Sequence, residues 1–570
     1  MNKKSLFLIA GVVTLSLIGY AAFKFFMPGT GHLKLIPKNS MVVMTVDIKE
    51  IGEKIDFDGK LKDTRVYRDI MKEQNRRIKE DKTDSTSMAI KELLENPLST
   101  GVNVFSDAYL FVYNDGKTNF VGVTIDLNDK GKWEKTVKKL KLSDNNFKKG
   151  EGYKCLPISE TMILAWNDKG LLFLNREFDY YAMISSPKGL DRLESVVGKF
   201  MNQTKEESIL AIPEFGNLKP DENDASLFIN YDEYNKQFSK ETEVAYSSPA
   251  YSVLKSIMAN FKGVYACCNL NFEDNQIAFK SKLYGDPKNL EKINYMKAKG
   301  VSEEALDYIT GSGRLLAVLS ANIDLKKIAG IVSETKEGKQ LIADAAEYSG
   351  LTSQQLENLF SGELTLAVTD IKEIETKGFD YQIDEATGAY MPMEVIRKSP
   401  MPMMTFNVGV NNVADFDTFT SHTFDRSLNS GMPVPMPMGA FGYAQKVRHA
   451  KGCFISNDTI LSQMIQNNNK FSKKPDSEMC NLLKSNSGFL FFDLNLNHYP
   501  STFTDIMQTN MGKNQYGYFK SYMSLFKDIR MIANGSEFTI EINLQPGEGN
   551  AIYRIIKQSD YLPARNSPSY

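Results

Sequence analysis

Short stretches in which apolar and polar residues alternate dominate the chain, and amphipathic stretches separate them. Two such stretches surround tight turns: Lys262–Leu283 around Glu273, and Lys527–Leu544 around Asn534 and Gly535. Alternation with a period of two is typical of antiparallel strands that expose one face to water. The pattern therefore predicts a mainly antiparallel sheet protein, with helices in the intervening amphipathic stretches.

The apolar pattern that opens the body of the chain returns in its second part. Ser40–Ile51 reads SMVVMTVDIKEI, and Leu315–Ile328 reads LLAVLSANIDLKKI, so that Asp47 aligns with Asp324. In both copies an apolar strand runs into Asp, a hydrophobic residue and a lysine. We expect the two aspartates to lie at the ends of equivalent strands.

The elements that follow each copy come in the same order. A helical stretch is followed by a leucine-rich turn entering a strand, a strand feeding a helix, another apolar strand and a hairpin. The matched stretches are Glu92–Val112 with Leu356–Val368, Phe120–Leu140 with Thr405–Phe419, and Ala225–Asp232 with Ser487–Leu494. The sequence therefore predicts an α+β fold of two tandem related halves, residues 30–295 and 296–560. Each would have helices on one face of its sheet.

Capping residues mark several expected helix ends around the junction of the two halves. Pro287–Met296 reads as a helix, and Ser302 precedes a short apolar stretch with acidic residues in its first turn. Thr352 and Gln355 have the spacing of a capping box, in which each side chain bonds the other residue's backbone. These positions predict helices that begin at residues 303 and 353.

The N-terminal segment carries no charge from Ser5 to Phe23 and follows Lys3 and Lys4. About 20 apolar residues cross a bilayer core, and flanking lysines stay in the cytoplasm. Residues 5–27 are therefore predicted to be a membrane anchor, with residues 1–4 as a cytoplasmic stub and the body in the periplasm or outside the cell. The alternative is a cleaved signal peptide. No cysteine lies nearby, which excludes a lipid-anchored N-terminal cysteine.

Composition restricts the function classes without selecting one. The 570 residues are 42% hydrophobic and 24% charged, with a formal net charge of −2. These values are ordinary for a globular chain of more than one domain, and a weakly acidic body gives no electrostatic basis for binding nucleic acid. The five cysteines, an odd number, are read as small buried residues with at most one or two bridges.

The opening strand also carries a family resemblance. Residues 36–40 read IPKNS before the first apolar strand, and both strands end at an Asp–hydrophobe–Lys step. This pattern resembles an uncharacterised family, a domain of unknown function, of exported and often lipid-anchored envelope proteins from bacteroidete-type Gram-negative bacteria. The resemblance implies an envelope location and no established activity. The chain departs from the lipid-anchored members because it lacks the anchoring cysteine.

Catalytic signatures do not stand out. The chain has no G-x-S-x-G, H-E-x-x-H, P-loop or C-x-x-C motif, and its histidines are scattered at positions 32, 422, 449 and 498. Ser252 and Lys255 form an S-x-x-K, but three other S-x-x-K matches are equally good and no K-T-G accompanies them. No catalytic residue and no cofactor is assigned.

Methionine and proline cluster in the second half, in stretches 391–404 and 432–438. Proline excludes regular helix and favours extended chain, so these stretches are interpreted as insertions relative to the first half. Three interpretations stay open: apolar segments packed on the sheet, a flexible surface for a protein partner, and a soft-metal site for Cu(I). The candidate thioether ligands are Met391, Met393, Met401, Met403, Met404, Met432, Met436 and Met438.

Three hypotheses for function follow. The first is a membrane-anchored envelope protein without catalysis, a scaffold or binding body for an unidentified ligand or envelope partner. The second is an envelope hydrolase whose site is assembled from residues that no motif marks. The third is copper binding through the methionine-rich stretches.

Overall fold

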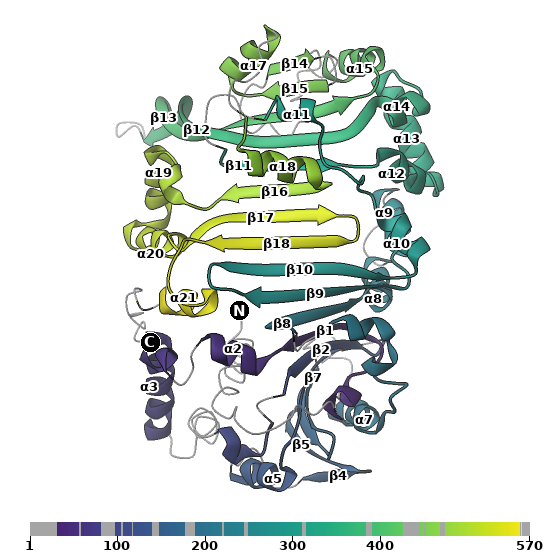
Figure 1. Ribbon diagram of the computed structural model, residues 1–570, viewed down its shortest axis with the longest axis vertical. Helices are drawn as coiled ribbons and strands as arrows, with labels where there is room; N and C mark the ends of the chain where they lie inside the picture. The colour runs from purple at the N-terminus through teal and green to yellow at the C-terminus, as the bar shows by residue number, and fades with distance from the viewer. Residues whose placement is uncertain are drawn as a thin grey trace. The chain divides into compact units, whose positions relative to one another are not determined.

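The computed structural model describes the chain from residue 31 to residue 560 with internal gaps (Figure 1). The described ranges are 31–55, 59–80, 97–103, 106–116, 118–139, 147–176, 189–218, 222–243, 249–309, 315–383, 390–425, 445–449, 452–467, 474–558 and 560. The fold is a mixed α+β fold with extensive antiparallel sheet and helices.

Contacts divide the chain into two compact units. Unit 1 comprises the chain up to Tyr246, Met258–Ile293 and the chain from Pro546 onward, and unit 2 comprises Ser247–Ile257 and Asn294–Gln545. The sequence analysis ends the second half at residue 560. The structure instead groups helix α21 (Ala551–Gln558) with unit 1, because Ile552 and Ile556 pack beside the buried cluster that contains Ile55 and Trp133.

The sheet of unit 1 is built around β1 (Ser40–Val46), which pairs antiparallel with β2 (Ala108–Asn114) on one side and β8 (Ala225–Asn230) on the other. The order is β4-β5-β6-β7-β3-β2-β1-β8-β9-β10, and every pairing is antiparallel. The remaining strands are β3 (Asn119–Ile125), β4 (Lys148–Gly150), β5 (Tyr153–Ser159), β6 (Met162–Trp166), β7 (Leu171–Arg176), β9 (Val264–Phe272) and β10 (Gln276–Gly285).

Apolar clusters lie on both faces of this sheet. One cluster contains Phe111 with Phe200 of helix α7 (Gly189–Asn202), and the other contains Trp166 with Trp133 of helix α5 (Lys130–Lys139). Strands such as β6 (MILAW) are apolar at consecutive positions, and consecutive side chains of a strand point to opposite faces. The prediction of helices on one face is therefore wrong for this unit: helices contribute to the cores on both.

Helix α2 (Ile48–Lys54) follows β1 directly, and the side chain of Asp47 accepts a hydrogen bond from the backbone N–H of Glu50 at 2.8 Å. Lys54 at the end of α2 donates to both carboxylate oxygens of Asp224 at 2.8 Å, and the Asp224 side chain is fully buried. Burial acts to lower the pKa of Lys54, but its hydrogen bond and attraction to Asp224 raise that pKa above its ordinary value. This ion pair connects the end of α2 to the residue that precedes β8.

The other helices of unit 1 surround the sheet. They are α3 (Arg65–Glu80), α8 (Tyr231–Glu243) and α10 (Pro287–Ile293), with short 3-10 turns η2 (Gly31–Leu35), η3 (Lys60–Asp63), η4 (Pro97–Thr100), η5 (Ile209–Ala211) and η6 (Pro213–Leu218). Helix α9 (Pro249–Ala259) spans the point where the chain passes between the units.

The sheet of unit 2 is built around β11 (Ala317–Asn322), which pairs antiparallel with β12 (Phe360–Ile383) and β16 (Gly488–Asp493). Its order is β14-β15-β13-β12-β11-β16-β17-β18, again antiparallel throughout. The other strands are β13 (Tyr390–Val410), β14 (Gln445–His449), β15 (Gly452–Ser456), β17 (Phe526–Asn534) and β18 (Glu537–Leu544).

Side chains cap the first turns of several helices of unit 2. Asp324 caps α12 (Leu325–Val332) as Asp47 caps α2, Ser302 caps α11 (Glu303–Leu306), and Thr352 with Gln355 forms the capping box of α14 (Ser353–Leu359). The other helices are α13 (Lys336–Ser349), α15 (Val413–Thr420), a π-helical turn (Ser421–Asp425), α17 (Thr459–Gln466), α18 (Ser477–Ser485), η10 (Leu496–His498), α19 (Ser501–Met511) and α20 (Lys513–Met523).

The segment predicted to anchor the chain, residues 5–27, lies outside the described residues. Within the described ranges, no helix combines the length and apolar composition that a membrane span requires.

The buried pair of Lys54 and Asp224 generates a prediction about stability. Replacing Lys54 by Met leaves a buried carboxylate without its cation, and we expect a loss of about 3–5 kcal/mol in the free energy of unfolding. Trp133 and Trp166 are the two tryptophans of the chain, and both lie in unit 1, so their fluorescence in urea reports this loss.

The matched control is Lys130→Met. Lys130 also bonds an aspartate at 2.8 Å, but its partner Asp168 is 88% exposed. We expect at most about 1 kcal/mol for this variant. Equal losses for the two variants would contradict the account of the buried pair.

Candidate ligand-binding pocket

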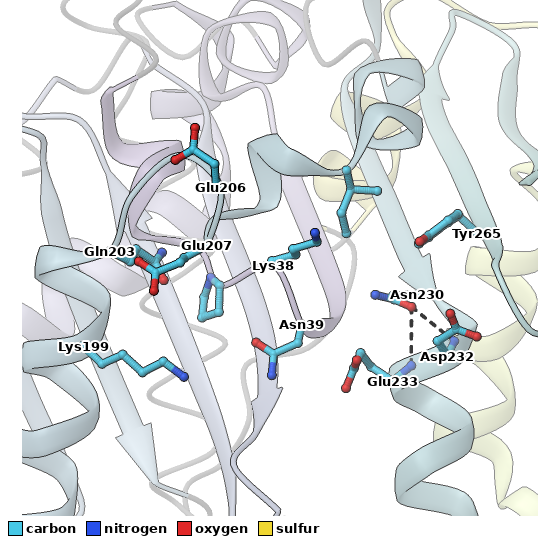
Figure 2. Close-up of a pocket in the computed structure, with 12 residues that line it drawn as sticks. Lys38, Asn39, Lys199, Gln203, Glu206, Glu207, Asn230, Asp232, Glu233 and Tyr265 are labelled. Carbon is cyan, nitrogen blue, oxygen red and sulfur yellow. Dashed lines mark hydrogen bonds between the residues drawn. The ribbon is translucent and has the colours of Figure 1, made fainter.

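A cavity of about 450 Å³ opens in unit 1 where β1 begins and β8 ends (Figure 2). Its walls come from the segment before β1, the end of α7 and the turn after it, the start of α8, and β9. The lining residues are Pro37, Lys38, Asn39, Lys199, Gln203, Glu206, Glu207, Ile212, Asn230, Asp232, Glu233 and Tyr265. Polar and charged residues therefore make most of the wall.

Backbone hydrogen bonds hold one wall in place. The N–H of Lys38 donates to the carbonyl of Glu207 at 2.8 Å, and Pro37 forms an isolated antiparallel bridge with Ser208. The amide of Gln203 reaches across and donates to the carbonyl of Lys34 at 2.6 Å. The turn that carries the two glutamates of the cavity is thus fixed against the chain entering β1.

The opposite wall is the start of helix α8. The side chain of Asn230, the last residue of β8, accepts hydrogen bonds from the N–H groups of Asp232 at 3.2 Å and Glu233 at 3.4 Å (Figure 2). Asp232 in turn accepts from the N–H of Gly263 at 2.8 Å. Asn230 caps the first backbone N–H groups of α8, and the acidic side chains of the first turn interact favourably with the partial positive charge at the helix N-terminus.

Tyr265 completes this wall from β9, with its ring stacked on Phe228 at a centroid distance of 5.5 Å. Burial raises the pKa of Tyr265, and the nearby carboxylates of Glu214, Asp232 and Glu233 raise it further. The phenol is therefore neutral at physiological pH and serves as a hydrogen-bond donor or acceptor.

The carboxylates of Glu206, Glu207, Asp232 and Glu233 line the cavity with Lys38 and Lys199. Lys236 bonds Glu233 from outside it, so four carboxylates stand against three ammonium groups. The ammonium group of Lys199 lies 5.7 Å from the ring centre of Tyr113, a cation–π distance. Hydrogen bonds to backbone and to Thr204 lower the pKa of Glu206, so this carboxylate is ionised at neutral pH.

A smaller hollow of about 230 Å³ shares Asn39 and Glu233 with the main cavity. It is formed by the turn after β2 and the first turns of α8. Asp115 in this turn is bonded by Arg192, and Glu233 is bonded by Lys236 at 2.6 Å. The two hollows together form a polar depression along one end of the sheet of unit 1, and carboxylates outnumber ammonium groups among its lining residues.

The lining groups are carboxylates, ammonium groups, amides and one phenol, which are groups that bind polar ligands by charge and hydrogen bonds. None of the residues that line this cavity was predicted from the sequence to form a site. Its signals were present in the strand ASLFIN followed by the acidic start YDE of α8, and in the residues PKNS before β1. What brings these segments together is the pairing of β1 with β8.

The structure separates the candidate thioether ligands. Met391 and Met393 are exposed on β13, whereas Met401 and Met404 are half-buried and Met403 is buried eight or more residues further along the same strand. Eight residues of strand span about 27 Å. Met432, Met436 and Met438 lie outside the described residues. Among the described residues, Met401, Met403 and Met404 are therefore neighbours on one strand, while Met391 and Met393 lie apart from them.

The histidines also lie apart. His32 is buried against the ring of Tyr109, the Nδ1 of His422 bonds the carbonyl of Thr418, and His498 bonds Asp493 at 2.7 Å. The side chain of His449 lies outside the described part of the chain.

The five cysteines form no disulfide with one another, and all but Cys480 are buried. Burial raises the pKa of Cys267 to about 12, so this thiol is unreactive at neutral pH.

Comparison with known proteins gives one match. The family model described as "Domain of unknown function (DUF4836)" matches residues 33–377, which include all the strands of unit 1 and most of β12. No curated protein and no solved structure matches the chain.

The buried His32 generates a prediction about pH. Burial lowers its pKa below 6.5, against the attraction of Asp126, so the unfolded chain binds a proton more readily than the folded one. Stability is then complete above pH 6.5 and falls as the pH drops through the lowered pKa, by at most about 1.4 kcal/mol per pH unit.

His32→Leu should remove this part of the acid sensitivity. The measurement is the free energy of unfolding in urea at pH 7.5 and pH 5.5, for the wild type and the variant, with tryptophan fluorescence as the signal. An unchanged difference between the two pH values in the variant would show that His32 does not titrate as described.

Proposed function

Since the chain belongs to the DUF4836 family, whose function is unknown, we propose from its own site that it is a non-enzymatic binding protein of the cell envelope. The observation that carries this proposal is the polar cavity of unit 1. Its ligand is a small polar molecule with a cationic group. Four carboxylates line a cavity of about 450 Å³ together with only two lysines.

The charge and geometry of the walls support a cationic ligand. Asp232 and Glu233 stand on one wall, and Glu206 and Glu207 on the other, so a cationic group between them is attracted from both sides (Figure 2). Amide groups of Asn39 and Gln203 and the phenol of Tyr265 add hydrogen bonds that orient the rest of the ligand. Binding by charge at a half-open site weakens as salt rises.

Location in the envelope is the second part of the proposal. Ser5–Phe23 is uncharged and follows Lys3 and Lys4, which supports a retained membrane anchor at residues 5–27 with the body outside the cytoplasm. A cleaved signal peptide ending near Ala21 is the alternative, and it exports the same body.

We also infer that the two units are diverged copies of one topology. The order β7-β3-β2-β1-β8-β9-β10 of unit 1 parallels the order β15-β13-β12-β11-β16-β17-β18 of unit 2. In each, the central strand runs into an aspartate that caps the next helix. Divergence then explains why unit 1 carries the cavity while unit 2 carries the elongated hairpin β12–β13.

The binding proposal is tested by calorimetry on the purified full chain in mild detergent. The probes are spermidine and arginine amide as cations, maltotriose as a neutral molecule and succinate as an anion. We expect the cations to bind and succinate not to bind. The double variant Glu206→Gln, Glu207→Gln should weaken cation binding about tenfold or more, which corresponds to about 1.4 kcal/mol.

The control is Glu53→Gln, because Glu53 is exposed on α2 and does not line the cavity. Cation affinity should be unchanged in this variant. Binding of succinate or maltotriose in preference to the cations, or equal affinity in the double variant and the wild type, would refute the proposed ligand class.

The anchor is tested by cell fractionation and protease treatment of spheroplasts. A retained anchor leaves the chain in the membrane fraction with Met1 or Asn2 at its N-terminus and with the body digested by external protease. A soluble mature form that begins near Ala22 would select the signal-peptide alternative, and a protected body would overturn the orientation.

A further inference from the structure

The hairpin β12–β13 continues beyond the sheet of unit 2 as a two-stranded ribbon. β11 pairs with β12 up to Val368, and β15 pairs with β13 from Thr405. Between Asp370–Ile383 and Tyr390–Met403 the two strands pair with each other alone among the described residues (Figure 1). The corresponding strands of unit 1, β2 and β3, have seven residues each, against 24 in β12 and 21 in β13.

The outer part of the ribbon exposes apolar side chains. Seven of them are between 44% and 71% exposed: Phe379, Tyr381, Ile383, Tyr390, Met391, Met393 and Ile396. A two-stranded ribbon is at best marginally stable in water unless further strands join it or a helix packs against it. Helix α19 contacts β13, yet the seven apolar side chains stay exposed, and a further strand would cover part of them.

One edge of the ribbon is closed to such a strand by prolines. At the root of β13, the N–H of Met404 donates to Asn457 at 2.7 Å, and the carbonyl of Pro402 accepts from Asn457 at 2.8 Å. The backbone groups of the even-numbered residues thus point to the outer edge. Pro392, Pro400 and Pro402 are even-numbered, so their missing N–H groups interrupt that edge.

The other edge, that of β12, remains open. Each even-numbered residue of β12 lies opposite an odd-numbered residue of β13, and the backbone groups of these two residues bond each other. The N–H and C=O groups of the odd-numbered residues of β12 therefore point away from β13, toward the outer edge. β12 contains no proline, and no described strand pairs with it beyond Val368. The N–H of Ile371 already donates to Oδ1 of Asp370 at 2.7 Å, so an added strand finds outward donors and acceptors from Glu373 to Tyr381.

The sequence along this edge is complementary to itself. An antiparallel copy of β12 centred on Thr376 places Lys372 opposite Asp380 and Glu375 opposite Lys377. It also places Ile371 opposite Tyr381, and no like charges meet. Moving the centre by one residue to Glu375 places Asp370 opposite Asp380, and moving it to Lys377 leaves no pair of opposite charges.

We propose that two copies of this chain associate through the open edges of their β12 strands. A two-fold axis at Thr376 makes a continuous four-stranded sheet, β13-β12 of one copy with β12-β13 of the other, joined by about ten backbone hydrogen bonds. Phe379 and Tyr381 of each copy, which are 65% and 68% exposed in the single chain, then lie beside β12 of the partner.

Charge at the ribbon favours a second copy over a lipid surface. Asp380 and Glu394 are exposed within the same outer part as the aromatic residues, and carboxylates disfavour transfer into a membrane. Lys372 donates to the buried Asp458 at 2.9 Å and is still 41% exposed, so its other N–H groups can meet Asp380 of the partner.

The test uses the purified full chain in mild detergent, with the protein mass measured by sedimentation. We expect twice the 64.2 kDa of one chain at micromolar concentration. Glu375→Pro removes an outward N–H from β12 without removing a bond to β13, and it should reduce the mass to that of one chain. Lys398→Pro is the matched control, because Lys398 lies opposite Glu375 with its N–H on the edge already closed by prolines. It should stay dimeric.

Two further measurements identify the register. Glu375→Lys or Lys377→Glu alone should weaken the dimer at least about tenfold, and the two together should restore it, since the exchanged charges again oppose each other. Thr376→Cys should form a disulfide between copies on mild oxidation, because residues at the two-fold axis lie about 4.5 Å apart between Cα atoms. Glu394→Cys should not.

Three results would overturn the proposal. They are a wild-type chain that is monomeric at micromolar concentration, whether or not it binds lipid vesicles; a dimer that persists in Glu375→Pro; and a Thr376→Cys variant that stays uncrosslinked in the dimer. Unchanged thermal unfolding of each variant monomer establishes that the fold survives the substitution.

Discussion

The pairing of backbone N–H and C=O groups at sheet edges is the constraint on which this architecture depends. In each unit the first strand of the sheet, β1 or β11, lies in the centre, because a strand from each side pairs with it. All further strands add antiparallel, and each addition moves the unpaired edge outward. The unpaired N–H and C=O groups of an edge strand are covered by other chain segments, interrupted by residues such as proline, or paired with another strand. In the ribbon β12–β13, the prolines of β13 interrupt one edge, and beyond Val368 no described strand other than β13 pairs with β12.

The same central arrangement supports different features in the two units. In unit 1, the pairing of β1 with β8 brings the residues before β1 close to the acidic start of α8, and the polar cavity forms there. In unit 2, the hairpin that follows the central strand is extended into the ribbon. We therefore propose ligand binding at unit 1 and association between copies through unit 2.

Local signals in the sequence predicted local structure well. The hairpin expected around Glu273 is found as β9 and β10, and the hairpin around Gly535 is found as β17 and β18. Ser302 and the pair Thr352 and Gln355 cap helices at the predicted positions. These features depend on residues close in the chain, so short patterns are sufficient to reveal them.

Features that depend on distant segments were not predicted. The cavity needs Lys38 beside Glu207 and Asn230, which only the strand pairing brings together. From the sequence, the methionine–proline stretch 391–404 was interpreted as an extended insertion, because proline is excluded from regular helix. In the structure, the alternation of methionine and proline follows the two edges of a strand, with proline on the side that carries no hydrogen bonds to β12. The pattern has a meaning only once the partner strand is known.

Hydrogen exchange of the backbone amides of β12 tests the role of the open edge most directly. The full chain is compared at a dilute and a micromolar concentration, with the outward amides of odd-numbered residues 373–381 as the reporters and those of Glu394, Ile396 and Lys398 as internal controls. The account predicts slower exchange of the β12 amides at the higher concentration and no change at the controls. Exchange of the β12 amides that is equally fast at both concentrations would contradict it.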